Sequence, residues 1–278
     1  MKSKNLVIKE NNEVKYIEYS FFDKLGFVRA IGSTRYGGVS DGIDNSSMNL
    51  GFNTIDNKEN VQSNYTIFAN ATGLNENMIV TSSQFHNDNI RVCSTYDAGK
   101  GITKERDFED IDALVTNTPG LSLAVFSADC VPILYADKVS RSIGAAHCGW
   151  RGTFKSLASK TAQKMADEFN ASKEDICVII GVSIKKCCYE VSKELYMDFV
   201  NEFPFIDDGI CCEIKNGKYY LDLPLINKKI LLDFGIKEEN IFIADLCTCC
   251  NKDHLFSHRG QGKGRGIMAS FVTISDNQ

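Results

Sequence analysis

Short apolar runs alternate with amphipathic stretches along most of this chain. Runs of strand length occur at 27–31, 78–81, 121–126, 131–135, 143–146, 176–182, 241–244 and 269–274. The central runs contain almost no polar residue, which is typical of strands buried on both faces. Because helical patterns separate several of these runs, the sequence predicts an α/β fold with at least one mixed sheet.

The first helix is predicted from its end signals. Asp56 and Glu59 have the spacing of a capping box, an apolar stripe covers 61–68, and Gly73 is a stop signal. Apolar residues at helical spacing, or a proline start and a glycine stop, predict three further helices at 154–169, 192–203 and 224–234.

Composition limits the class of protein. The chain has 278 residues, 43% of them hydrophobic, with four prolines and no low-complexity run, so we expect one compact domain spanning 1–278. A net charge of -5 argues against a broad surface for nucleic acid or acidic membranes. The charged N-terminus does not resemble a signal peptide, and no apolar window has the length of a membrane span. We therefore expect a cytoplasmic protein; the pattern does not predict its oligomeric state.

The chain has 11 cysteines. A long chain without an export signal favours reduced thiols. Cys187 with Cys188, and Cys211 with Cys212, are adjacent pairs, which is a poor arrangement for disulfides between distant strands. We expect most of the cysteines to be small buried hydrophobes, with one or two on a metal.

Three potential metal ligands lie at the ends of predicted strands. His86 follows the run at 78–81, Cys130 interrupts an apolar run, and His147 ends the run at 143–146. Two imidazoles and one thiolate suit a catalytic Zn²⁺ ion, because three protein ligands leave one coordination position open. Two other interpretations remain: a metal-free pair with Cys130 as nucleophile and His147 as base, and a structural role for all three side chains.

A second metal and an anion site are also considered. Cys247, Cys249, Cys250 and His254 offer thiolates and an imidazole, but three sulfurs in a Cys-x-Cys-Cys run are too cramped to share one tetrahedral ion comfortably. Arg35, Arg151 and the basic segment 258–266 are candidates for binding phosphate through guanidinium groups and exposed amides.

Several short motifs occur in one order along 27–269. They are Thr34-Arg35-Tyr36-Gly37-Gly38-Val39-Ser40, Met48-Asn49-Leu50-Gly51, Ser83-Gln84-Phe85-His86, Asp112-Ala113-Leu114-Val115-Thr116, Ser127-Ala128-Asp129-Cys130-Val131-Pro132, Ala145-Ala146-His147-Cys148-Gly149-Trp150-Arg151-Gly152-Thr153, Cys188-Tyr189-Glu190-Val191, Cys247-Thr248, Phe256-Ser257-His258-Arg259 and Gly264-Arg265. In order and spacing they resemble the laccase-domain family, also called the multicopper polyphenol oxidase or YfiH-like family, which is associated with purine nucleoside phosphorylase activity.

The resemblance implies a fold and a metal site. It implies mixed β-sheets sandwiched between helices, and a zinc site made by His86, Cys130 and His147, where copper is an alternative ion. Asn87 stands where the family usually has glycine, and Cys148 where it usually has alanine. The tail at 257–260 also departs from the family pattern, which leaves the substrate contacts there open.

The resemblance also implies a zinc-dependent phosphorylase of adenosine, inosine, guanosine and methylthioadenosine, with adenosine deaminase activity. Asp129 is expected to transfer protons. Arg35, Asn49, Arg151 and Arg259 are expected to contact nucleoside or phosphate.

Other functions remain open beside this hypothesis. They are a metal-free cysteine hydrolase that uses Cys130 and His147, a copper-dependent phenol oxidase, and a structural role. Four histidines are too few for a multicopper centre.

Overall fold

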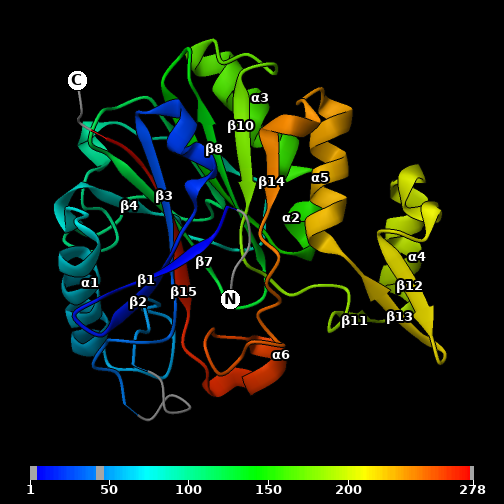
Figure 1. Cartoon of the computed structure of the whole chain (residues 1–278), viewed down its shortest axis with the longest axis horizontal. Helices are drawn as coiled ribbons and strands as arrows, with labels where there is room; N and C mark the ends of the chain where they lie inside the picture. The colour runs from blue at the N-terminus through cyan, green and yellow to red at the C-terminus, as the bar shows by residue number, and fades with distance from the viewer. Residues whose placement is uncertain (1–4, 42–46, 276–278) are drawn as a thin grey trace.

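The computed structural model describes residues 5–41 and 47–275, and its centre consists of two six-stranded sheets packed face to face (Figure 1). In spatial order the first sheet contains β1 (Val7–Asn11), β2 (Val14–Glu18), β3 (Val28–Ser33), β15 (Met268–Ile274), β7 (Ser122–Ser127) and β4 (Ile79–Thr81). The second contains β14 (Ile241–Ile243), β10 (Ile176–Ile180), β8 (Val131–Asp137), β9 (Ser142–Cys148), β6 (Ala113–Thr116) and β5 (Ile90–Val92). Both sheets are mixed: β4 with β7, β10 with β14, and β5 with β6 pair in parallel.

Helices cover the outer face of each sheet (Figure 1). The helix α1 (Lys58–Thr72) packs on the first sheet, and α2 (Trp150–Phe154), α3 (Leu157–Phe169) and α5 (Leu223–Phe234) pack on the second. At one edge, α4 (Lys193–Glu202) lies against a small sheet of β11 (Glu190–Val191), β13 (Lys218–Leu221) and β12 (Cys212–Lys215). The short helix α6 (His258–Gln261) precedes β15. The predicted α/β fold, with mixed sheets between helices, is confirmed.

The central strands are buried on both faces, as their continuous apolar runs predict. In β8, Leu134 points into the core between the two sheets, whereas its neighbours Ile133 and Tyr135 point into the core under the helices. All three side chains are fully buried. Successive residues of a strand face opposite sides, so the apolar run of this one strand serves two cores.

Two helix predictions need correction. The expected helix at 154–169 is two helices, because Ser156 adopts a left-handed conformation with φ +57 and interrupts the run between α2 and α3. The residue that caps α1 is Asn57, whose side chain accepts a hydrogen bond from the backbone N–H of Asn60. Asp56 instead accepts from the side chain of Asn49.

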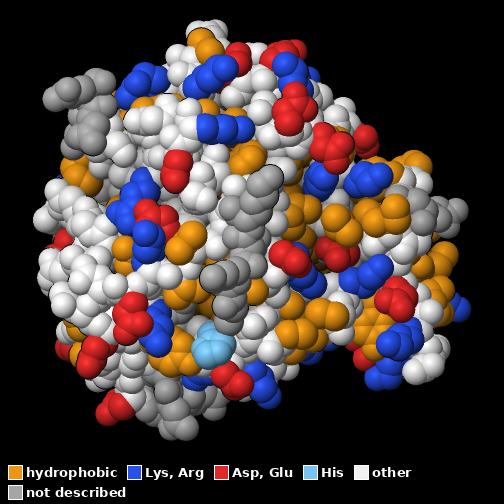
Figure 2. All heavy atoms as spheres, in the orientation of Figure 1, with side chains coloured by type: hydrophobic (Ala, Val, Ile, Leu, Met, Phe, Trp, Pro, Cys, Tyr) orange, Lys and Arg blue, Asp and Glu red, His pale blue; other side chains and the backbone are white. Residues whose placement is uncertain are grey.

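The surface is mixed in charge. Figure 2 shows Lys and Arg side chains interspersed with Asp and Glu over the visible face, with no large basic patch among the coloured residues. Within 5–41 and 47–275, no helix combines the length and the apolar character needed to cross a bilayer.

The central core gives the first prediction. Replacing Leu134 by Ala leaves a cavity between the two sheets and is expected to lower the free energy of unfolding by about 2–5 kcal/mol. Val139→Ala is the control, because Val139 lies 67% exposed in the turn after β8. Equilibrium denaturation measures both variants. If Leu134→Ala costs no more than the control, the face-to-face packing of the sheets is wrong.

Candidate functional site

The three predicted metal ligands meet at one end of the two central sheets. One ligand atom each from His86, Cys130 and His147 lies within 4.8 Å of the others. Nitrogen and sulfur ligands of one tetrahedral zinc ion lie roughly 3.3–3.6 Å apart, so a donor set within 4.8 Å fits one zinc ion with modest adjustment. His147 is buried, Cys130 is half-buried and His86 is exposed. The site is therefore closed by protein around His147 and open to solvent around His86.

Strand register brings two of the ligands together. Cys130 lies in the turn between β7 and β8, and His147 is the penultimate residue of β9. Because Pro132 pairs with His147 in the antiparallel ladder, Cys130 lies opposite Gly149. A Cβ atom at Gly149 would come within 3.1 Å of both the Cys130 sulfur and the His86 ring. The glycine of the Gly-Trp-Arg-Gly motif thus leaves room for the ligands.

The carboxylate of Asp112 holds the two histidine segments in place. Its Oδ1 atom is 2.8 Å from Nδ1 of His147 and accepts the backbone N–H of His86 at 3.1 Å. Its Oδ2 atom accepts the backbone N–H groups of Phe85 and Asn87, each at 2.9 Å. Asp112 is fully buried just before β6. With Nδ1 bound to this carboxylate, His147 presents Nε2 to a metal, as in carboxylate–histidine–zinc arrangements.

The loop that carries His86 is fixed to the sheet by Gln84. The Gln84 side chain donates to the Phe126 carbonyl at 2.9 Å and accepts the Phe126 N–H at 2.6 Å. Phe126 is near the end of β7, a few residues before Cys130. His86 itself adopts φ +62, a conformation that a non-glycine residue occupies when its surroundings hold it there. Gln84 and Asp112 provide those surroundings.

The electrostatics of the site favour an ionised sulfur. Burial acts to raise the pKa of Cys130, but the positive charge and hydrogen bond of His147, together with His86, lower it to about 6. Burial acts to lower the pKa of His147, but Cys130 and Asp112 raise it to about 9. A thiolate beside an imidazolium is the state that these shifts favour without a cation. Metal binding then needs the loss of only the imidazolium proton.

Asp129 holds the turn before Cys130. Its Oδ1 atom accepts from the hydroxyl groups of Thr248 and Ser257 at 2.6 and 2.7 Å, and its Oδ2 atom accepts the backbone N–H of Arg259 at 2.6 Å. Asp129 adopts φ +105 and is 8% exposed. These three donors give the carboxylate a positioning role; proton transfer by Asp129 stays a prediction.

The three ligands line a cavity of about 230 Å³. Phe52, Phe85 and Phe126 give it aromatic walls, and Arg106 and Arg265 bring positive charge. Arg106, Phe52 and two other lining residues also border an open groove of about 860 Å³. A cavity with apolar walls and a few convergent polar groups is typical of a small-molecule site.

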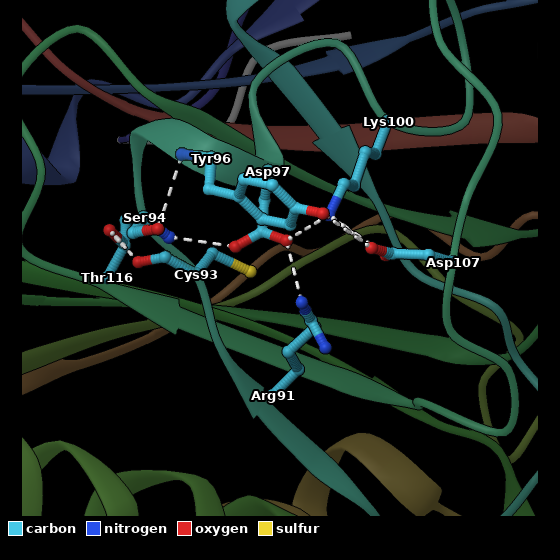
Figure 3. A network of polar contacts seen from close by, with 8 residues as sticks. All are labelled: Arg91, Cys93, Ser94, Tyr96, Asp97, Lys100, Asp107 and Thr116. Atoms are coloured by element: carbon cyan, nitrogen blue, oxygen red, sulfur yellow. Dashed lines mark hydrogen bonds and ion pairs between the residues drawn. The ribbon is translucent and has the colours of Figure 1, made fainter.

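A charged network fixes the loop that carries Arg106. In Figure 3, the Lys100 ammonium group lies between the carboxylates of Asp97 and Asp107, with nitrogen–oxygen distances of 3.0 and 2.9 Å. The Arg91 guanidinium pairs with the Asp97 carboxylate at 2.7 Å. Arg106 then donates to the Ser82 carbonyl at 2.7 Å, beside the loop of His86. The guanidinium is thereby held at the cavity wall.

Arg265 reaches the same cavity from the other side. Burial lowers the pKa of Arg265 below its usual value, and the negative charges of Asp129 and Cys130 offset only part of this effect. Because these two charges act on it, the guanidinium lies close to the turn that carries Cys130. Its Nε atom is buried and has no hydrogen-bond partner among the described residues. An anion in the cavity would supply the missing acceptor.

The expected substrate contacts Arg35, Asn49, Arg151 and Arg259 are not among the described residues that line the cavity. Arg35 is buried, donates to the Lys252 carbonyl and stacks on Phe256. Asn49 is buried and accepts the N–H groups of Gly51 and Ile267.

Arg151 lies over the ring of Trp150, and Arg259 donates to the carbonyls of Cys188 and Glu190. The four contacts with substrate stay predictions. Sequence reasoning missed Arg106. It included Arg265 within the basic segment 258–266 as a phosphate candidate, but did not place it beside the three ligands.

Comparison with known proteins identifies the family of this chain. Residues 29–275 match the model of the family described as multi-copper polyphenol oxidoreductase laccase. The chain belongs to this family. It is 30% identical over 245 residues to the purine nucleoside phosphorylase YlmD of Bacillus subtilis, covering 88% of this chain and 87% of the relative. It is 33% identical to a purine nucleoside phosphorylase of Bacteroides thetaiotaomicron, covering 87% and 90%. The crystal structure of YlmD from Geobacillus stearothermophilus superposes with a TM-score of 0.88 at 27% identity, covering 98% of this chain and 100% of that one.

The next prediction concerns Asp112 and the affinity of the candidate site for zinc. In Asp112→Asn the side chain loses its charge and one of its two acceptor oxygens, so His147 is no longer held in one orientation. We expect the affinity of zinc for the three-ligand site to fall about 10–100-fold.

Asp110→Asn is a matched control. Its Oδ2 atom accepts from the side chains of Asn87 and Asn89, and its φ of +54 suits asparagine. Competition with a zinc chelator measures both affinities. Equal affinities in the two variants would show that Asp112 does not position a metal ligand.

Proposed function

We propose that this protein is a zinc-dependent purine nucleoside phosphorylase of the cytoplasm, with adenosine deaminase activity. Its expected substrates are adenosine, inosine, guanosine and methylthioadenosine, with inorganic phosphate as the second substrate. One observation carries the proposal: the His86, Cys130 and His147 side chains open into the same cavity as Arg106 and Arg265. The names of the relatives support the same reaction.

His86, Cys130 and His147 would hold the zinc ion. Zinc, when bound, supplies a Lewis acid and lowers the pKa of a water molecule that it binds. Asp112 keeps His147 in the tautomer that leaves Nε2 available, and the loop of Gln84 keeps His86 beside it. The protein thus orders the ligands before the substrate arrives.

The aromatic walls would receive the purine. Phe52, Phe85 and Phe126 line the cavity, and Phe85 is 61% exposed although it lies next to a metal ligand. A flat aromatic base gains contact area and stacking energy against such side chains. Burial of the base there would direct the ribose towards the charged groups.

The arginines would hold the phosphate. Phosphorolysis forms a bond between a phosphate oxygen and the anomeric carbon, and breaks the bond between that carbon and the purine nitrogen. The purine leaves with the bonding electrons and takes up a proton. Arg265, whose Nε has no hydrogen-bond partner in the described part of the chain, and Arg106 can neutralise and orient the attacking phosphate. Arg151, at the exposed start of α2, remains a candidate for binding phosphate as it enters the cavity.

A cysteine hydrolase is the second candidate, and a specific geometry favours it. Cys130, His147 and Asp112 form a connected row in which Asp112 holds the imidazole and His147 lowers the pKa of the thiol. Such an enzyme would keep its activity in a chelator and lose it to iodoacetamide. The second imidazole beside the sulfur, from His86, favours a metal instead.

Phenol oxidation at several coppers finds less support. The chain has four histidines. Of these, His254 is bound to the Tyr36 hydroxyl at 2.9 Å, and His258 begins α6. Two imidazoles at one site allow a single copper ion there.

The reaction itself is the next prediction. Protein loaded with zinc is expected to convert inosine and phosphate to hypoxanthine and ribose 1-phosphate, and adenosine to adenine or inosine. His147→Ala is expected to lose both the metal of this site and turnover. Chromatography of the products measures turnover. Full activity in a variant that holds no metal at this site would contradict the mechanism.

Arg265 gives a prediction that concerns phosphate alone. Loss of a hydrogen-bonded charge costs about 1.5–3 kcal/mol, so Arg265→Gln is expected to raise the KM for phosphate roughly 10–100-fold. The KM for inosine should change much less. Arg141→Gln is the control, because Arg141 lies in the turn at the opposite end of β8 and β9, over the ring of Phe27. An unchanged KM for phosphate would remove Arg265 from the anion site.

A further inference from the structure

Four cysteines meet at a second place in the fold. The sulfur atoms of Cys187, Cys188, Cys247 and Cys250 all lie within 4.8 Å of one another. The sulfur of Cys250 is 3.4 Å from that of Cys188 and 3.6 Å from that of Cys187. These separations exceed the disulfide bond length of about 2.05 Å. We call this set the four-cysteine cluster.

The pairing of two parallel strands creates the cluster. The strands β10 and β14 are neighbours, and an isolated bridge continues the pairing at Ser183 and Cys247. The segment that leads from β10 to β11 and the one that leads from β14 to α6 therefore run close together (Figure 1). This topology excludes the set considered from the sequence, because His254 points to Tyr36 instead.

We propose that the four-cysteine cluster binds a structural zinc ion. Four thiolates are a common ligand set for structural zinc, and Cys247 and Cys250 have the two-residue spacing of a zinc knuckle. Sulfurs at about 2.3 Å from a tetrahedral ion lie roughly 3.8 Å apart. The observed separations of 3.4 and 3.6 Å are close to this value.

The surroundings of the sulfurs also suit a cation. Cys187 and Cys250 are exposed, so the cluster is not a set of core thiols, although most cysteines of the chain are buried as expected. The Cys247 sulfur accepts hydrogen bonds from the backbone N–H groups of Cys250 and Lys185. Amide hydrogen bonds of this kind also support metal-bound thiolates.

The ion would join the two segments that hold the turn of the first site. The backbone N–H of Ile184 donates to the Asp129 carbonyl at 2.9 Å, and the Thr248 hydroxyl donates to the Asp129 carboxylate at 2.6 Å. Each segment thus contacts the residue before Cys130. A structural ion at the cluster would keep both contacts in place without taking part in the reaction.

Metal content tests the proposal. Protein purified under reducing conditions without chelator is expected to hold two zinc ions per chain by mass spectrometry of the elements. The double variant His86→Ala, His147→Ala should keep one, and Cys187→Ser, Cys250→Ser should also keep one. Cys249→Ser is the matched control, because Cys249 lies in the same turn but outside the cluster, and it should keep two. This experiment separates the cluster from the proposed function, since each pair of substitutions removes a different ion.

Two results would overturn the proposal. One is a zinc content that falls to zero in the His86, His147 variant, or that is unchanged in the Cys187, Cys250 variant. The other is a disulfide between Cys250 and Cys187 or Cys188 in freshly purified wild-type protein that holds no second ion. A further measurement does not depend on the folding of variants. Cobalt added alone to metal-free wild-type protein should give intense sulfur-to-cobalt absorption, and Cys187 and Cys250 should then resist a thiol reagent. Rapid labelling of both thiols in the cobalt-loaded protein would contradict binding at the cluster.

Discussion

A single buried carboxylate joins the parts of this protein that must meet. Asp112 accepts three successive backbone N–H groups around His86 and also the ring of His147. An unpaired buried carboxylate is costly, and the four donors remove that cost while they fix two segments far apart in sequence. The loop after β4 in one sheet and the end of β9 in the other are thereby held in register. The cavity, the candidate ligands and their electrostatics follow from this contact.

Much of the fold could be predicted from the sequence because its signals are local, whereas the three ligands are grouped by the family resemblance. Continuous apolar runs mark β8, β9 and β10, and the ligands lie at the ends of such runs. The hairpin of β1 and β2 was missed, because its outer strand is mostly exposed and its turn depends on Asn12 and Glu13, both at positive φ. The break at Ser156 was missed because the apolar spacing continues across it.

The missed site residues depend on tertiary structure. Arg106 lies in a loop whose position depends on the Lys100 ion pairs, and nothing in its neighbours points to the cavity. The four-cysteine cluster needs Cys187 and Cys250 from segments that only the pairing of β10 with β14 brings together. Within one segment, Cys250 groups with His254 instead, which the structure places against Tyr36. A compact motif can be recognised in a sequence, whereas a group assembled by strand order is recognised only where family motifs mark its members, as they do for His86, Cys130 and His147.

The candidate metal site and the four-cysteine cluster lie on either side of Asp129. The strained turn of Asp129 carries Cys130 on one side and is held by Thr248, next to Cys247, on the other. The reaction and the stability of the site are therefore connected through one short stretch of backbone. Family resemblance accounts for the first site, and the packing of neighbouring loops accounts for the second.

The decisive experiment is a crystal of the protein soaked with inosine and phosphate and measured on both sides of the zinc absorption edge. We expect an anomalous peak within bonding distance of the side chains of His86, Cys130 and His147, and density for an anion at Arg265. A zinc-loaded crystal without a peak at this position, but with nucleoside bound elsewhere, would contradict this expectation.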